Sequence, residues 1–327
     1  MKAYVLRSYG PPEVLTLSDV PTPEPGPGEV LVRVRATSVQ PYDWHHMRGE
    51  PYVARLMGGT LGPRGPRLSV LGADVAGQVE AVGAGVTAFG PGDEVFALLT
   101  GGGFAEYVSV RESDLVRKPE NLSFEQAAAV PLAAATALLA LDEGRVRPGH
   151  EVLVNGASGG VGTFAVQLAR AFGAEVTGVC GPRNVDLVRS LGAGEVVDYS
   201  RADFTRTGRR YDVLLDIAGT KPPAACRRVL RPRGTHVVVG GPAGRWLQPV
   251  GHTIAALATS PFTSRRVVLA DVTRCRENRA NLVKLAGLIE QGDLTPVVDR
   301  VYPFDDLPAA VRYVEEGHAR GKVVVTL

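Results

Sequence analysis

The chain has few cysteines. Its 327 residues include three, Cys180, Cys226 and Cys275, which lie far apart and form no C-x-x-C pair. This spacing argues against a disulfide framework and against a thiolate metal cage, because both need cysteines that converge. We therefore interpret the three residues as ordinary buried thiols.

Long apolar runs and blocks of like charge are also missing. No apolar stretch approaches the roughly 20 residues of a membrane helix, and the start, MKAYVLRSYG, lacks the continuous apolar core of a secretory signal. The formal net charge is only +2, and the basic patches are short. These features argue against a membrane or nucleic-acid partner and favour a cytoplasmic protein.

The first part of the chain has a β-rich pattern. Short alternating runs such as 30–35 are separated by turn clusters such as PTPEPGPG, which predicts a barrel or sandwich. The stretch RLMGGTLGPRGP at 55–66 has four glycines and two prolines, which predicts a surface loop. Such a loop could border a substrate pocket or be a merely tolerated insertion.

The pattern changes at Ser123, where helix formers begin and where Ser123 and Gln126 are spaced as a capping box. Short apolar strands then alternate with helices, which predicts a parallel sheet covered on both faces. We expect strands at 151–155, 175–180, 196–198, 213–216 and 236–239, and helices at 161–172 and 185–191. After about residue 271 we expect helices at 279–291 and 307–316 and a final strand in GKVVVTL. The predicted domains are 1–123, 124–270 and 271–327.

The strongest motif is VLVNGASGGVG, in which an apolar strand leads through three spaced glycines into a helix. Glycines allow the tight turn, the close approach of a pyrophosphate and the packing of helix on strand. The pyrophosphate would accept hydrogen bonds from the backbone N–H groups at the helix N-terminus. The predicted donors are Ser158, Gly159, Gly160, Val161 and Gly162.

The end of the second strand indicates which dinucleotide is bound. An NAD enzyme places an acidic residue there, but this chain has GVCGPRN at 178–184. Arg183 can instead offer a planar, permanently charged guanidinium to a 2′-phosphate. The sequence therefore predicts NADP(H) as cofactor.

Seven segments together resemble one known family. They are MKAYVLRSYGPPEVL, VQPYDWHHMRG, LGADVAGQVEAVGAGVTAFGPGDEVFA, GGGFAEYV, VPLAAATAL, NGASGGVG and the terminal GKVVVTL. Nearly the whole chain resembles the zinc-independent, zeta-crystallin-like quinone oxidoreductases of the medium-chain dehydrogenase/reductase superfamily. The resemblance implies an α/β protein with a GroES-like β-rich catalytic domain and a Rossmann, doubly wound nucleotide-binding domain. It also implies a homodimer that transfers hydride from NADPH to a quinone or to another small electrophilic carbonyl compound.

The resemblance also bears on zinc. Zinc-dependent relatives place ligands in the segments that match VQPYDW, LGAD and the domain junction, where this chain has Gln40, Ala73 and VPLAAATAL. Glutamine and alanine do not replace Cys, His or carboxylate ligands, so we expect no catalytic metal. Adjacent side chains diverge on a helix or strand, so the pair His45-His46 is a poor metal site.

Individual roles also follow from the resemblance. Gln40, where the family usually has Asn, is the leading polar contact for the nicotinamide or substrate. Tyr42 and Tyr52 are candidates for polarising the carbonyl or donating the proton, and Asp43 is expected to hold its loop. The further residues expected near the cofactor are Thr136, Arg183, Asn184, Tyr199, Ala218, Gly240, Pro261 and Phe262. Two alternatives stay open, an enoyl-thioester reductase and a non-enzymatic NADPH-binding protein.

Overall fold

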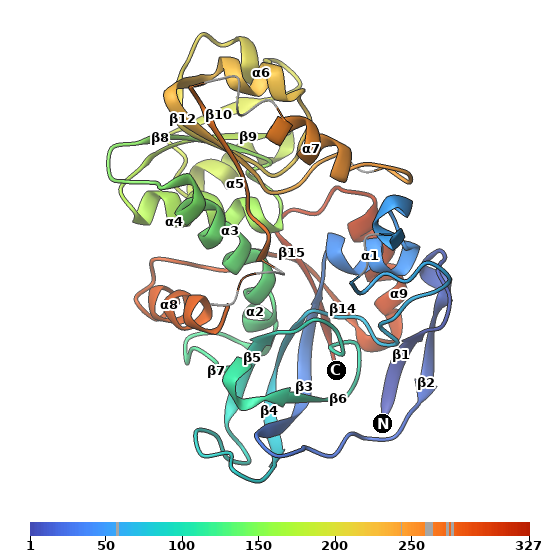
Figure 1. Ribbon diagram of the computed structural model, residues 1–327. Coiled ribbons are helices and arrows are strands. Elements are labelled where there is room, and N and C mark those ends of the chain that lie inside the picture. The colour runs from blue at the N-terminus through green and yellow to red at the C-terminus, as the bar shows by residue number, and fades with distance from the viewer. Residues whose placement is uncertain (57–58, 243, 259–263, 273–274, 276–277) are drawn as a thin grey trace. The chain divides into compact units, whose positions relative to one another are not determined.

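A computed structural model describes residues 1–56, 59–242, 244–258, 264–272, 275 and 278–327 (Figure 1). The chain forms two compact units. Unit 1 comprises Met1–Leu132, Cys275–Gly292 and Pro296–Leu327, and unit 2 comprises Ala133–Arg274 and Asp293–Thr295. None of the described helices combines the length and the apolar character that crossing a bilayer requires.

Unit 1 is built around the long strand β3 (Glu29–Val39), most of whose residues are buried. It pairs antiparallel with three strands that are distant in sequence, so the C-terminal strand lies beside a strand from the first 39 residues of the chain. The main sheet has the order β14 (Val298–Pro303), β15 (Lys322–Thr326), β3, β4 (Asp74–Val82), β5 (Glu94–Leu98) and β7 (Leu115–Arg117), with β6 (Tyr107–Arg111) paired to β3. A separate pair consists of β1 (Lys2–Leu6) and β2 (Leu15–Asp19).

The α-helices that accompany these strands in the described part of unit 1 are α1 (Pro41–Arg48), α2 (Phe124–Ala128), α8 (Asn278–Glu290) and α9 (Leu307–Glu315). Helix α1 follows directly from β3 and packs on α9 through a core that includes Trp44, Met47 and Val311. The predicted capping box is confirmed, because Ser123 and Gln126 exchange hydrogen bonds of 3.1 and 3.3 Å at the start of α2.

Unit 2 contains a six-stranded parallel sheet (Figure 1). Its order is β10 (Glu195–Asp198), β9 (Glu175–Cys180), β8 (Glu151–Asn155), β11 (Tyr211–Asp216), β12 (Leu230–Val238) and β13 (Arg266–Leu269). The chain starts in the middle, winds to one edge and returns to complete the other side, which is the Rossmann order. The predicted fold class, a β-rich unit with a Rossmann unit, is confirmed.

The helices of unit 2 are α3 (Pro131–Gly144), which begins in unit 1, α4 (Gly160–Ala171), α5 (Val185–Ser190), α6 (Pro223–Arg228) and α7 (Val250–Ala258). Strand β8 is buried from Val152 to Asn155, and α4 is buried from Gly162 to Ala169. Such buried elements need mainly apolar or small side chains, which explains VLV in β8 and most of GTFAVQLA in α4. The two larger polar residues, Asn155 and Gln167, form buried hydrogen bonds instead.

Candidate functional site

The glycine turn between β8 and α4 is sterically constrained. Gly156 has φ of +96°, and Gly159 caps the helix. A Cβ on Gly162 would lie 2.0 Å from the carbonyl oxygen of Gly156, so only glycine lets α4 start this close to the strand. The turn lies where the strand order reverses between β8 and β11, at the carboxyl ends of the strands. That is where open parallel sheets bind ligands.

The predicted adenosine-side residues gather beside this turn. Asn184 donates from Nδ2 to Ser158 Oγ over 3.0 Å, and its Oδ1 is buried without a hydrogen-bond partner in the described part of the chain. Tyr199 is 67% exposed and lies so close to Gly181 that a Cβ there would approach its hydroxyl to 2.8 Å. Arg183 is exposed in the 3₁₀ turn Pro182–Asn184.

Backbone hydrogen bonds connect the segments that follow β11 and β12 to the carboxyl ends of the neighbouring strands. The carbonyl oxygen of Asn155 accepts the amides of Ile217 and Ala218 at 3.1 and 3.2 Å. The carbonyl oxygen of Asp216 in turn accepts the amide of Gly240 at 3.2 Å. Ala218 and Gly240 therefore follow strands that end beside the glycine turn, and their contact with the cofactor stays a prediction.

Three remaining candidates are placed less specifically. Thr136 is buried on α3 within unit 2. Pro261 and Phe262 lie outside the described residues.

In unit 1, Gln40 stands at the junction of β3 and α1 and is 4% exposed. Its backbone N–H donates to Asp43 Oδ2 over 3.0 Å, and its side-chain Oε1 accepts from Lys322 Nζ over 2.8 Å. Its Nε2 is buried and has no hydrogen-bond partner among the described residues. A buried amide N–H₂ without an acceptor is costly, which makes this group a candidate ligand contact.

The two tyrosine candidates already have partners. Tyr42 donates its hydroxyl to the carbonyl oxygen of Thr100 over 3.0 Å. Burial, helped by the charge of Asp43, raises the pKa of Tyr42 to about 12. The ring of Tyr52 lies 4.6 Å from the guanidinium carbon of Arg55, a cation–π contact.

The neighbouring acid and histidines are held by the backbone. Asp43 is fully buried and also accepts the amide of Gly72 over 3.1 Å. Burial raises the pKa of Asp43 to about 7, although its two backbone donors act in the opposite direction. His45 Nδ1 lies 3.1 Å from the carbonyl oxygen of Glu50, and His46 Nδ1 lies 2.7 Å from that of Tyr42.

Comparison with known proteins agrees with this geometry. Residues 26–120 match the model for the alcohol dehydrogenase GroES-like domain, and residues 191–325 match that for zinc-binding dehydrogenase. A chloroplast envelope quinone oxidoreductase homolog of Arabidopsis thaliana is 33% identical over 99% of this chain and 98% of its own length. The chain belongs to the quinone oxidoreductase branch of the medium-chain dehydrogenase/reductase family. The predicted family is confirmed, and the protein is an oxidoreductase.

Other relatives fit the same assignment. An NADPH-dependent alkenal/one oxidoreductase of Arabidopsis thaliana is 36% identical over 99% of this chain and 79% of its own length. The structure of the quinone oxidoreductase from Coxiella burnetii superposes with a TM-score of 0.85 at 29% identity, covering 100% of this chain and 99% of that one. The family is nicotinamide-dependent, and the glycine turn with the unpartnered Asn184 Oδ1 suits such a cofactor.

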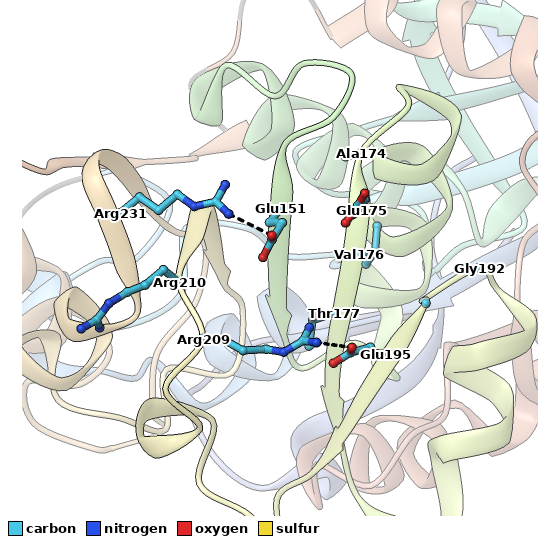
Figure 2. A pocket seen from close by; sticks show the side chains of 11 residues that line it. Glu151, Ala174, Glu175, Val176, Thr177, Gly192, Glu195, Arg209, Arg210 and Arg231 are labelled. Atoms are coloured by element: carbon cyan, nitrogen blue, oxygen red, sulfur yellow. Dashed lines mark hydrogen bonds and ion pairs between the residues drawn. The ribbon is translucent and has the colours of Figure 1, made fainter.

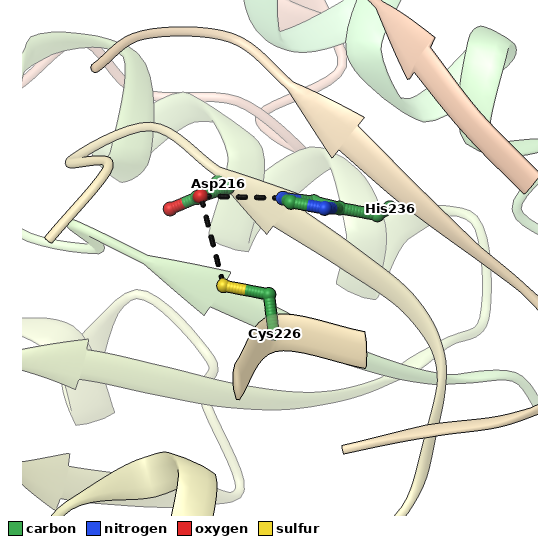
Figure 3. A group of neighbouring side chains, drawn as sticks. All are labelled: Asp216, Cys226 and His236. Atoms are coloured by element: carbon green, nitrogen blue, oxygen red, sulfur yellow. Dashed lines mark hydrogen bonds and ion pairs between the residues drawn. The ribbon is translucent and has the colours of Figure 1, made fainter. Parts of the chain in front are cut away.

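At the carboxyl end of β11, the oxidoreductase has a buried polar cluster around Asp216 (Figure 3). One carboxylate oxygen accepts from Asn155 Nδ2 at 2.8 Å, and the other lies 3.2 Å from His236 Nε2 and 3.4 Å from His252 Nε2. Burial alone would raise the pKa of Asp216, but the hydrogen bonds from the two histidines and Asn155 lower it overall. Asp216 therefore stays ionised and fixes the end of β11.

Ligating atoms of Asp216, Cys226 and His236 lie within 4.8 Å of one another, as metal ligands do. Burial and the charge of Asp216 raise the pKa of the Cys226 thiol, so the thiol stays protonated at neutral pH. Its sulfur lies 3.9 Å from the carboxylate, at the distance of a weak S–H donor. The contacts thus form a hydrogen-bond cluster centred on the carboxylate.

A hollow of about 670 Å³ opens at the amino ends of the strands of the same sheet (Figure 2). Glu151, Glu175 and Glu195 begin strands β8, β9 and β10 there, and Arg231 pairs with Glu151 at 2.9 Å. Arg209 pairs with Glu195. Because ligands of parallel sheets bind at the carboxyl ends of strands, this hollow is not the cofactor site.

Besides the Asp216 cluster, sequence reasoning missed a buried polar group in unit 1 that includes Ser38, Asp74 and Lys322, which are 0%, 0% and 3% exposed. Lys322 Nζ lies 3.2 Å from Asp74 Oδ2, which also accepts from Ser38 Oγ at 2.6 Å. The signal that could have indicated them was a charged residue beside an otherwise apolar strand, in LGAD and in GKVVV.

Proposed function

We propose that the chain is an NADPH-dependent, zinc-independent reductase of quinones or α,β-unsaturated carbonyl compounds. The observation that carries the proposal is the glycine turn of β8 and α4, because a side chain at Gly162 would meet the backbone at 2.0 Å. The names of the relatives support the substrate class, since they are a quinone oxidoreductase homolog and an alkenal/one oxidoreductase.

The preference for NADPH is supported by the residues after β9. This strand ends at Cys180 without a carboxylate that would accept ribose hydroxyls, and an exposed Arg183 follows. A guanidinium attracts a 2′-phosphate, whereas a carboxylate would repel it.

Independence from zinc is supported by the surroundings of Gln40. Ala73 is buried and offers no ligand, and the amide oxygen of Gln40 already accepts from the ammonium of Lys322. A positive charge 2.8 Å from the only oxygen of the amide opposes a divalent cation at that oxygen.

In the proposed reaction the bound cofactor supplies hydride. The chain binds and orients the acceptor, and Gln40 Nε2 donates to its carbonyl oxygen, where negative charge develops. The hydroxyl of Tyr42 already donates to the carbonyl oxygen of Thr100 and has a pKa of about 12, so we propose that solvent supplies the proton. A role for Tyr52 stays a prediction.

The test is NADPH oxidation in the presence of a metal chelator, with a panel of quinones, enones and crotonyl thioesters, and with NADH as the comparison cofactor. Chelator-insensitive turnover that favours NADPH supports the proposal. Turnover with thioesters alone would instead indicate the enoyl-thioester reductase. Tight NADPH binding without turnover of any acceptor would indicate the non-enzymatic binding protein.

Two further predictions concern the protein as a whole. We propose a homodimer, which sedimentation would detect as particles of twice the 34.5 kDa chain mass. Particles of a single chain would contradict it. Cytoplasmic location also stays a prediction, which fractionation of the source cells would test.

A further inference from the structure

Unit 1 contains a buried polar group that packing alone does not explain. Strand β3 pairs with β4 on one side and with β15 on the other, with Ser38 opposite Asp74 and Val39 opposite Val323. Extending the antiparallel register by one residue brings Lys322 opposite Gln40. All four polar side chains, Ser38, Gln40, Asp74 and Lys322, are at most 4% exposed.

Asp74 holds the ammonium of Lys322 in place. Its Oδ1 accepts the amide of Leu132 over 2.8 Å, and its Oδ2 accepts from Ser38 Oγ and Lys322 Nζ over 2.6 and 3.2 Å. These three contacts fix the Asp74 carboxylate, which forms a buried ion pair with the Lys322 ammonium. The position of Nζ is therefore set by an anchored partner.

Lys322 in turn decides which way the amide of Gln40 faces. An ammonium has three donors and no acceptor, so only the amide oxygen can face it. The Oε1 to Nζ distance is 2.8 Å. A flipped amide would place its N–H₂ against the charge, which is repulsive. Nε2 must therefore point the other way, and there it has no partner among the described residues.

A purely structural role explains this arrangement poorly. Apolar residues replace a buried ion pair at little or no cost in stability, and a buried amide N–H₂ without an acceptor destabilises the fold. A functional role explains both the buried ion pair and the buried amide without an acceptor, if the amide is held in place to donate to a ligand. A charge-assisted bond to the oxygen also polarises the amide, which strengthens its N–H groups as donors.

We propose that Lys322 is a positioning residue, which locks the Gln40 carboxamide so that its Nε2 donates to the carbonyl oxygen of a bound ligand. The inference deepens the proposed function and rests on it for the identity of the ligand. Both hydrogens of Nε2 can only donate, so this group would bind a hydrogen-bond acceptor. The ligand group that fits is a carbonyl oxygen, either neutral or gaining negative charge during the reaction.

The first experiment is a double-mutant cycle of Lys322→Met and Gln40→Leu, read as kcat and KM for NADPH oxidation with 2-cyclohexenone. Lys322→Met should lower kcat/KM about tenfold, the worth of one lost hydrogen bond, mainly through kcat. In the Gln40→Leu background the same change should have almost no further effect, because Lys322 acts through Gln40. Equal effects in both backgrounds would overturn the inference.

Two further variants guard against misfolding. Lys322→Met with Asp74→Asn removes both charges, so that no unpaired carboxylate remains, and it should lose the same activity as Lys322→Met. Lys118→Met is the matched control, because Lys118 is also buried in unit 1 but donates to the carbonyl oxygens of Pro119 and Leu122. It should keep wild-type kcat. A comparable loss in this control would overturn a specific role for Lys322.

A spectroscopic measurement separates this inference from the proposed function. The chain has six glutamines, so the side-chain amide signal of Gln40 can be assigned by its loss in Gln40→Leu. That signal should shift in Lys322→Met and stay unchanged in Lys118→Met. An unshifted signal overturns the inference even in an active enzyme. If the wild type reduces no acceptor, the proposed function fails, while the shift still decides whether Lys322 sets the amide.

Discussion

Two glycines in one turn should respond differently to the same substitution. An added Cβ at Gly162 would lie 2.0 Å from the Gly156 oxygen and 2.8 Å from the carbonyl carbon of Ala157. Both are backbone atoms, so α4 would have to move away from β8. At Gly159 the nearest atom would be 3.6 Å away, and φ is −83°, which alanine adopts without strain.

The expected magnitudes follow from these clearances. Overpacking of a closed contact costs about 1–3 kcal/mol, so Gly162→Ala should lower the free energy of unfolding by about 2 kcal/mol. It should also weaken NADPH binding at least about tenfold, because the backbone donors move. Gly159→Ala should keep its stability within about 0.5 kcal/mol but weaken binding about tenfold, because its methyl group stands between backbone and pyrophosphate.

The assays are urea unfolding midpoints and titration of NADPH fluorescence. Gly194→Ala is the matched control, since its Cβ would lie 4.0 Å from the nearest atom in an exposed loop before β10. It should behave as wild type in both assays. A Gly162→Ala variant with wild-type midpoint and affinity would refute the steric argument. A Gly159→Ala variant that keeps its affinity would refute the placement of the pyrophosphate.

Three other substitutions give separate tests. Arg183→Ala should weaken NADPH binding about tenfold and leave NADH binding unchanged in fluorescence titrations, because only NADPH carries the 2′-phosphate. Gly287→Ala should raise the unfolding free energy by about 0.5–1 kcal/mol, because the added Cβ meets no atom within 4 Å inside helix α8. Burial raises the pKa of Asp43 to about 7, so the folded chain keeps a proton that the unfolded chain releases above about pH 4. Wild-type unfolding free energy should therefore fall from pH 4 to pH 7 relative to Asp43→Asn, and equal urea profiles would contradict the burial argument.

Local patterns explain how much of unit 2 could be predicted. Strands 151–155 and 175–180 have the expected bounds, and the helix expected at 161–172 spans Gly160–Ala171. Strand β12 differs, because it begins at Leu230 rather than 236. Its register to β11 shifts after Leu230, and Arg233 has φ of 67°. The irregular polar segment RPRG at 231–234 therefore separates the first residue of the strand from its apolar part. Periodicity cannot indicate a strand whose alternation is interrupted.

The polar cluster of unit 1 could not be predicted in the same way. Gln40 and Asp74 lie 282 and 248 residues from Lys322, and they meet only because β15 returns to pair with β3. Alternation within a strand predicts which side chains share a face, but it does not determine which strands pair. The charges in LGAD and GKVVVTL were therefore each visible beside an apolar run, while their pairing with each other and with Gln40 was not.

Two side chains, Gln40 and Asn184, are indicated both by their unpartnered buried atoms and by the sequence. Among the described residues, buried polar side-chain atoms without a hydrogen-bond partner are found on Gln40, His150, Asn184, Tyr211 and His236. Gln40 and Asn184 are also the amide side chains expected near substrate and cofactor from the family resemblance, on grounds independent of any hydrogen bond. Each amide has one end fixed, by Lys322 and by Ser158, and the other end free. An amide fixed at one end is preorganised, so a ligand that satisfies the free end gains a hydrogen bond without ordering the side chain.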